Sequence, residues 1–168
     1  TLVEMNEKYK TSSAIVLGMH DALVSQTGII TGLAFSLANS QLIIMTAIIS
    51  AVADGLSMMA SNYLAECERT QRKTAIFAGL YTGAAFLVTC VLLTIPFFIT
   101  SNVPQAVLAS FAIAVIIIFL FNWCLARNSN RKMWQKFFEM LGICTLVSVI
   151  AYFIGQTAKN ILGIQNLL

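Results

Sequence analysis

Two aspartates lie inside long apolar stretches of this sequence and are the residues best placed to do chemistry. Asp21 falls in the stretch 14–37, and Asp54 falls in the stretch 42–64. A carboxylate near the centre of a membrane costs about 2.5–3.5 kcal/mol on insertion scales, so such residues usually face a bundle interior and mark a path for ions or protons. A structural role, in which each aspartate hydrogen-bonds or caps a neighbouring helix, is the alternative.

Helical periodicity groups the two aspartates with small residues and a methionine. At about 100° per residue, Asp54 shares a helix face with Met58, and Asp21 shares one with Gly28 and Gly32. Small residues line both faces, so we expect the two faces to approach each other closely. Asp21 and Met58 also fall at nearly the same depth, about 10 Å from the cytoplasmic ends of their stretches at a rise of about 1.5 Å per residue.

Two carboxylates with a thioether beside them suit a borderline-soft divalent metal such as Fe²⁺ or Mn²⁺. The hard ions Mg²⁺ and Ca²⁺ prefer oxygen ligands and would gain little from Met58. A methionine on a helix face is also ordinary core filling. The predicted metal path is therefore Asp21, Met58 and Asp54.

Three glutamates and the single histidine are weaker candidates. Glu66, Glu68 and Glu139 fall at the expected cytoplasmic ends of two stretches, where they could gather cations at the mouth of the path or simply be solvated. His20 could relay protons near neutral pH or hydrogen-bond a neighbouring helix. The sequence has no HExxH, GxSxG or P-loop motif, so we expect neither an enzyme nor a bound cofactor.

The composition indicates that membrane-spanning helices carry these residues. Apolar residues make up 58% of the 168 residues and charged residues 10%, against about 45–50% and 25% in soluble domains. A soluble enzyme, a secreted disulfide scaffold and a nucleic-acid-binding domain are therefore excluded. Short alternating segments of the β-barrel kind are absent. Five apolar stretches can each cross a hydrocarbon core of about 30 Å as a helix: 14–37, 42–64, 74–99, 104–126 and 137–157.

The predicted fold is thus an all-α, multi-pass integral membrane protein, with a five-span domain at 14–157 and tails at 1–13 and 158–168. Nine of the ten Lys and Arg residues fall on one side of this topology, and only Lys159 falls on the other. Positive residues favour the cytoplasmic side, so we expect a cytoplasmic N-terminus and a C-terminus outside or in a lumen. Five helices are few to enclose a polar path, so we also expect a homodimer.

Two segments resemble motifs of the vacuolar iron transporter family: HDALVSQTGIITGLAFS (20–36) and AVADGLSMMASNYLAECERTQR (51–72). The first is similar to the family's D-G/A-L-V segment at Asp21–Val24. The second is similar to its D-x-x-S-M-x-x-G-E-Y-L-like segment at Asp54, Ser57–Met58 and Tyr63–Leu64. Residues 139–156 also look like the family's fifth span.

The resemblance implies a homodimer of five-helix subunits that exports iron or manganese from the cytosol, commonly in exchange for protons. It places Asp21 and Met58 on the path. Asn62 departs from the family, which has Glu in the G-E-Y motif. The Glu-rich cytoplasmic segment between spans two and three is also missing, since Glu66 and Thr74 are only eight residues apart. The resemblance therefore indicates a minimal form of the transporter.

The expected partners are Fe²⁺ or Mn²⁺ as transported ions, protons, a second subunit and the lipid bilayer, with no nucleic acid. We expect the location to be a prokaryotic cell membrane, or a vacuolar membrane if the source is eukaryotic. Two other functions stay open. One is a non-transporting membrane assembly factor whose intramembrane aspartates pin helices together, and the other is an exporter of a small organic cation.

Overall fold

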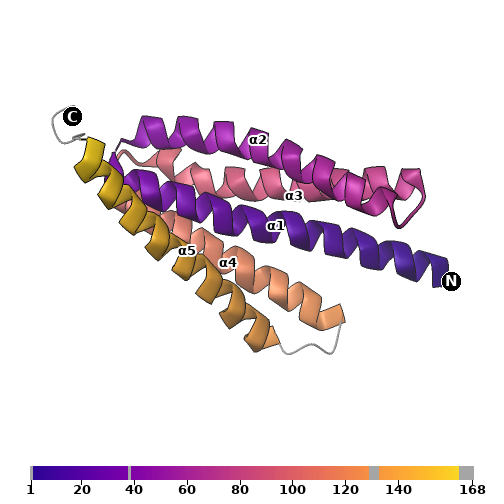
Figure 1. Cartoon of the computed structure of the whole chain (residues 1–168). Helices are drawn as coiled ribbons and strands as arrows, with labels where there is room; N and C mark the ends of the chain where they lie inside the picture. Colours follow the sequence, from indigo (N-terminus) through magenta and orange to yellow (C-terminus); the bar gives the residue numbers. More distant parts are fainter. Residues whose placement is uncertain (1, 38, 129–132, 163–168) are drawn as a thin grey trace. The chain divides into compact units, whose positions relative to one another are not determined.

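The computed structural model describes the backbone of residues 2–37, 39–128 and 133–162, and the side chains of 12–37, 39–123 and 134–161. Across these residues the chain forms five α-helices (Figure 1). They are α1 (Leu2–Ser36), α2 (Ser40–Cys67), α3 (Arg72–Ile99), α4 (Val103–Asn128) and α5 (Met133–Leu162). Each contains a segment long and apolar enough to cross a membrane. The predicted all-α fold with five potential spans is confirmed.

Most of the helices extend a few residues beyond the predicted apolar stretches. The backbone of the predicted tail 1–13 continues α1 from Leu2 onward, since no Gly or Pro interrupts the helix there. Helix α5 reaches Leu162, and residues 163–168 of the predicted C-terminal tail lie outside the described residues. Five of the basic side chains on which the predicted orientation depends also lie outside the described side chains: Lys8, Lys10, Arg127, Arg131 and Lys132.

The chain divides into two compact units, to both of which α1, α2 and α3 contribute. Unit 1 comprises Thr1–Ala22 and Ile48–Val91, and unit 2 comprises Leu23–Ala47 and Leu92–Leu168. Asp21, Asp54 and Met58 all belong to unit 1. The packing of helices within unit 1 therefore determines the positions of all three residues of the predicted metal path.

Unit 1 is held together by close approach between helix backbones. A Cβ atom on Gly79 would lie 2.7 Å from the Met59 carbonyl oxygen, and one on Gly18 would overlap the Thr82 carbonyl oxygen. Only glycine allows α3 to come this close to α2 and α1 at these two points. Helices α2 and α3 accordingly run side by side up to the turn that joins them (Figure 1).

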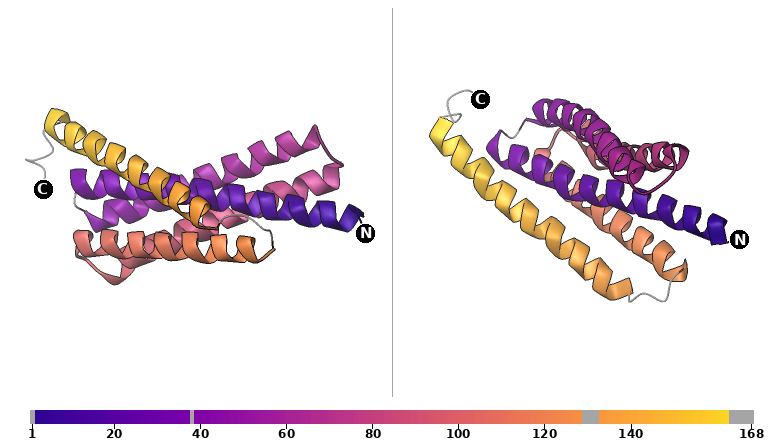
Figure 2. Two further views of the ribbon diagram at one scale, coloured as in Figure 1. Left: turned by 90° about the horizontal axis from the view of Figure 1, so that it is seen from below. Right: turned by 45° about the vertical axis from the view of Figure 1, so that its right-hand side comes forward.

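In unit 2, α1 packs on α5, which corrects one expectation from the sequence. A Cβ on Gly28 would lie 3.0 Å from Val147 Cγ1, and one on Gly155 would lie 2.5 Å from the Gly32 carbonyl oxygen. The small-residue face of α1 was expected to meet the second helix, but at Gly28 and Gly32 it meets α5. Helices α4 and α5 are in contact and cross at an angle (Figure 2).

Hydroxyl and amide side chains form different hydrogen bonds in these helices. Many hydroxyls donate to the carbonyl one turn earlier in their own helix, as Thr89 does to Ala85 at 2.8 Å and Ser148 does to Cys144 at 2.8 Å. The buried Gln26 amide instead donates to other helices, to the Ala47 carbonyl at 3.4 Å and to Thr94 Oγ1 at 3.3 Å. These side chains are thus satisfied either within their own helix or by a neighbouring one.

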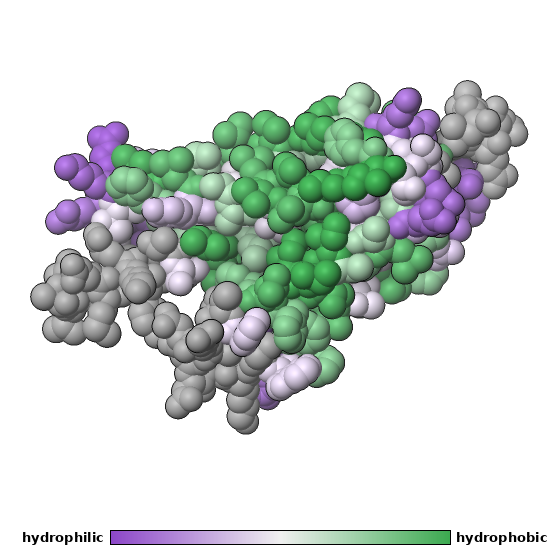
Figure 3. Space-filling model, turned by 180° about the vertical axis from the view of Figure 1, so that it is seen from behind, coloured by the Kyte–Doolittle hydropathy of each residue, from purple (hydrophilic) through white to green (hydrophobic). Residues whose placement is uncertain are grey.

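Large apolar side chains remain exposed along the middle of the helices. Ile49 is 61% exposed, and Phe153 is 62% exposed. Apolar side chains cover the middle of the visible face, whereas hydrophilic ones gather toward the helix ends (Figure 3). In a bilayer these exposed apolar side chains face lipid chains, as expected of a multi-pass integral membrane protein.

Candidate functional site

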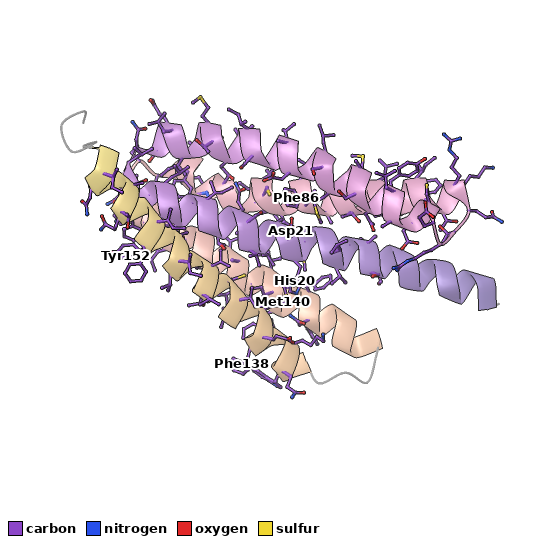
Figure 4. All side chains as sticks on the ribbon, in the orientation of Figure 1. His20, Asp21, Phe86, Phe138, Met140 and Tyr152 are labelled. Carbon is purple, nitrogen blue, oxygen red and sulfur yellow. The ribbon has the colours of Figure 1, made fainter. Side chains whose placement is uncertain are left out.

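Unit 1 brings Asp21 and Asp54 close enough for their charges to repel each other. Asp21 is exposed on α1, and Asp54 is half-buried on α2. Figure 4 shows Asp21 at the same level as Phe86 of α3. Two neighbouring negative charges in apolar surroundings attract a cation, because few other charges are there to balance them.

Unit 1 contains a small apolar cluster whose members are close in sequence to the two aspartates. It consists of the buried residues Ala22, Ala51, Phe86 and Cys90, and Met58 packs against it. Ala22 follows Asp21 directly, and Ala51 is three residues before Asp54, about one turn along α2. Of the three residues predicted to form the metal path, Met58 therefore packs against this cluster from three helices, and Asp21 is next in sequence to one of its members.

Cys90 lies near the aspartates and was not selected from the sequence. Its side chain is 1% exposed, and it is within electrostatic range of both Asp21 and Asp54. In the sequence it is an isolated cysteine in an apolar stretch, which is typical of a thiol that only packs. No spacing or partner motif distinguishes it, so only the structure could reveal its position.

The aspartate pair is not part of a larger metal-binding cluster among the described side chains. In that part of the chain, no three residues of the types His, Cys, Asp and Glu lie close enough together to hold a metal ion. The arrangement is an open pair of carboxylates with a thioether nearby. Such a pair differs from the closed four-ligand cages of structural metal sites.

His20 lies on a different side of α1 from Asp21, although the two residues are adjacent in sequence (Figure 4). Its side chain is half-buried and interacts with its surroundings. A turn of about 100° separates consecutive side chains on a helix, so His20 and Asp21 meet different neighbours. A role for His20 in proton relay stays a prediction.

The three candidate glutamates differ in their surroundings. Glu66 is half-buried near the end of α2, and its Oε2 atom is buried without a hydrogen-bond donor. Glu68 follows the end of α2 and is exposed, and Glu139 is exposed on α5 in unit 2. Buried carboxylate oxygens are rarely left without a partner, and Glu66 is the one of the three with a buried oxygen that no donor reaches among the described residues.

Comparison with known protein families identifies the family of this chain. The sequence model of the VIT family matches residues 12–75 and 65–156 of this chain. Among curated proteins, none matches the chain. The matched residues cover most of each of the five helices, and they include Asp21, Asp54 and Met58.

Proposed function

Because this chain belongs to the VIT family, whose members transport metal ions across membranes, we propose that it exports Fe²⁺ or Mn²⁺ from the cytosol in exchange for protons. One observation carries the proposal. Asp21 and Asp54, from two different helices, lie within electrostatic range of each other in unit 1, which also contains the apolar cluster. Unbalanced charge is costly in such a place, and a passing divalent cation would balance it.

The side chains around the pair favour a transition metal over Mg²⁺ or Ca²⁺. Asp21 and Asp54 would supply carboxylate oxygens, which all of these cations accept. Met58 would add a thioether sulfur, because it packs against the same cluster as the residues beside the aspartates. Soft sulfur ligands contribute more to Fe²⁺ than to hard cations. The expected substrates are therefore Fe²⁺ and Mn²⁺.

Proton exchange follows from the need to balance the same charges after the metal has left. Two neighbouring carboxylates without a cation repel each other, and a proton on one of them relieves the repulsion. A proton arriving from the far side would thus replace the departing metal at the aspartate pair. A pH gradient could then drive export without nucleotide hydrolysis.

Glu66 is our candidate for the cytoplasmic mouth of the path. Its buried Oε2 has no donor among the described residues, so a cation arriving from the cytosol could bind this oxygen without displacing any of them. Glu68 and Glu139 are exposed, and they would act only by raising the local concentration of cations. Helix α2 thus contributes a residue to both places: Glu66 to the mouth and Asp54 to the aspartate pair.

We further propose that two chains form a homodimer, with the N-terminus in the cytosol. Asp21 is exposed in the single chain, although intramembrane carboxylates seldom face lipid. A second subunit over this face would remove the conflict. A protein tagged after Leu168 tests both features. The tag should resist protease added on the cytosolic side, and the mass in mild detergent should equal two chains. A tag cut from the cytosolic side, or a monomer that transports normally, would contradict the proposal.

Reconstitution into proteoliposomes tests the function directly. We expect uptake of Fe²⁺ or Mn²⁺ but not of Mg²⁺ or Ca²⁺, because only the first two gain from the Met58 sulfur. Uptake should depend on an imposed pH gradient and cease when an ionophore collapses that gradient. Liposomes without protein are the control. Absence of metal uptake would refute the function, and uptake that ignores the pH gradient would refute the exchange with protons.

A further inference from the structure

The carboxamide of Asn62 on α2 is fixed in one orientation by α3. Its Nδ2 atom donates to Thr82 Oγ1 at 2.6 Å and to the Ala78 carbonyl oxygen at 3.2 Å. An amide nitrogen carries two protons, so both are used. Because a carbonyl oxygen can only accept, the nitrogen and not the oxygen of Asn62 must face Ala78.

Thr82 holds this amide in place and connects it to a third helix. Its side chain is fully buried, and its single proton has two acceptors within reach, the Ala14 carbonyl on α1 at 3.1 Å and the Ala78 carbonyl at 3.0 Å. The oxygen of the same hydroxyl accepts from Asn62. Gly18 lies against Thr82 without room for a Cβ atom, so Thr82 itself cannot shift easily.

The oxygen of Asn62 is left available. An amide is planar, and with both N–H groups directed at α3 its Oδ1 atom is on the other side of the group. Among the described residues no donor reaches Oδ1, and this atom is not a buried one. Asn62 therefore presents a neutral oxygen whose direction is set by two hydrogen bonds to its own nitrogen.

Asn62 lies on α2 between two residues of the proposed metal path. Asp54, Met58, Asn62 and Glu66 follow one another at intervals of four residues. On a helix this spacing is about one turn, or about 6 Å along the axis, for each step. Asn62 thus falls between the proposed cytoplasmic mouth at Glu66 and the sulfur of Met58.

We propose that Asn62 Oδ1 is a ligand for the transported cation between Glu66 and Met58, and that Thr82 acts as its positioning residue. This inference rests on the proposed function. A neutral amide oxygen holds a divalent cation less tightly than a carboxylate does, because affinity rises with the charge of the ligands. A cation would therefore dwell only briefly at this step and move on to the aspartate pair.

Substitutions at Asn62 test the ligand role in two opposite directions, with Mn²⁺ as the probe in proteoliposomes. Asn62→Leu removes the oxygen and should raise the KM for Mn²⁺ about tenfold, which corresponds to about 1.4 kcal/mol. Asn62→Asp loses both hydrogen bonds that the amide donates to α3, but it adds a charged oxygen ligand at this position, so it should lower KM and slow the maximal rate through delayed release. A purely structural role would lower stability in both variants and leave KM unchanged, which would overturn the proposal.

Thr82→Val tests the positioning role. The change keeps the shape of the side chain but frees the Asn62 amide, and it should raise KM several-fold. Thr89→Val is the matched control. Thr89 is also buried on α3 in unit 1, but its hydroxyl donates to Ala85 of its own helix. Equal KM values for the two variants would refute the positioning role. If the wild-type protein transports no Mn²⁺ or Fe²⁺, the proposed function itself has failed, and that outcome is visible without any variant.

Discussion

Asp21→Asn is expected to abolish metal uptake into proteoliposomes while the protein still inserts, folds and assembles. An amide has almost the same shape as the carboxylate but carries no charge, so it can neither balance a divalent cation nor exchange it for a proton. Asp21 is exposed in the single chain, so the change should disturb little packing within the subunit. Metal uptake and the melting temperature in detergent are to be measured on the same preparations.

Asp21→Glu is the matched variant for this experiment. It keeps the carboxylate and moves it by only one methylene, so we expect part of the transport to remain. The assembly-factor alternative makes the reverse prediction for Asp21→Asn. In that case assembly or stability would change, and metal uptake per molecule of protein would be normal. Normal uptake by Asp21→Asn would remove the proposed mechanism.

Gly18→Ala should cause the largest loss of stability among single-methyl substitutions in unit 1. The added Cβ would overlap the Thr82 carbonyl oxygen, so α1 and α3 would have to move apart. Overpacking of this kind costs about 1–3 kcal/mol. The hydrogen bond from Thr82 to Ala14 would be lost as well. The expected result is a clear fall in the melting temperature in detergent.

Gly142→Ala provides the control for that measurement. Gly142 is also within a helix, but a Cβ there would have no atom within 4 Å. Alanine favours helix over glycine by about 1 kcal/mol, so this variant should melt at the wild-type temperature or slightly above it. Equal losses of stability at Gly18 and Gly142 would mean that close packing of α1 on α3 does not stabilise unit 1.

The five helices were predictable from the sequence because a membrane span needs about 20 apolar residues in a row. Their ends were less predictable. Helix α2 runs over Ser40–Cys67, whereas the apolar stretch covers only 42–64, because polar residues continue a helix without adding to hydropathy. The membrane orientation stays a prediction from the Lys and Arg residues.

Helical periodicity showed which side chains share a face but not which helix that face meets. It grouped Asp54 with Met58; in unit 1 Asp54 lies within electrostatic range of Asp21, and Met58 packs against the apolar cluster that contains Ala22. It also suggested that the Gly28 and Gly32 face would meet the second helix, and this was wrong because that face packs on α5. Small residues allow close approach to any neighbour, so they cannot identify one.

Two residues of α3 could not be selected from the sequence. Thr82 and Cys90 are uncharged, and their residue types and spacing match no binding motif. Their roles depend on groups in distant segments: Thr82 bonds to Asn62 and Ala14, and Cys90 lies near the two aspartates. Contacts of this kind exist only once three helices have packed together.

The hydrogen bonds that two side-chain amides donate have a consequence for the order in which the helices become stable in the bilayer. Gln26 on α1 donates to Thr94, and Asn62 on α2 donates to Ala78 and Thr82; all three acceptors lie on α3. Hydroxyls that bond within their own helix, as Thr89 does, are satisfied as soon as that helix forms. The Asn62 amide is not, because both of its acceptors lie on α3, and a polar group without a partner is costly in hydrocarbon. Gln26 also donates to the Ala47 carbonyl on α2, so α3 supplies only its second acceptor. Helix α2 therefore emerges during synthesis with an amide whose acceptors are still missing, and the arrival of α3 supplies acceptors to both α1 and α2.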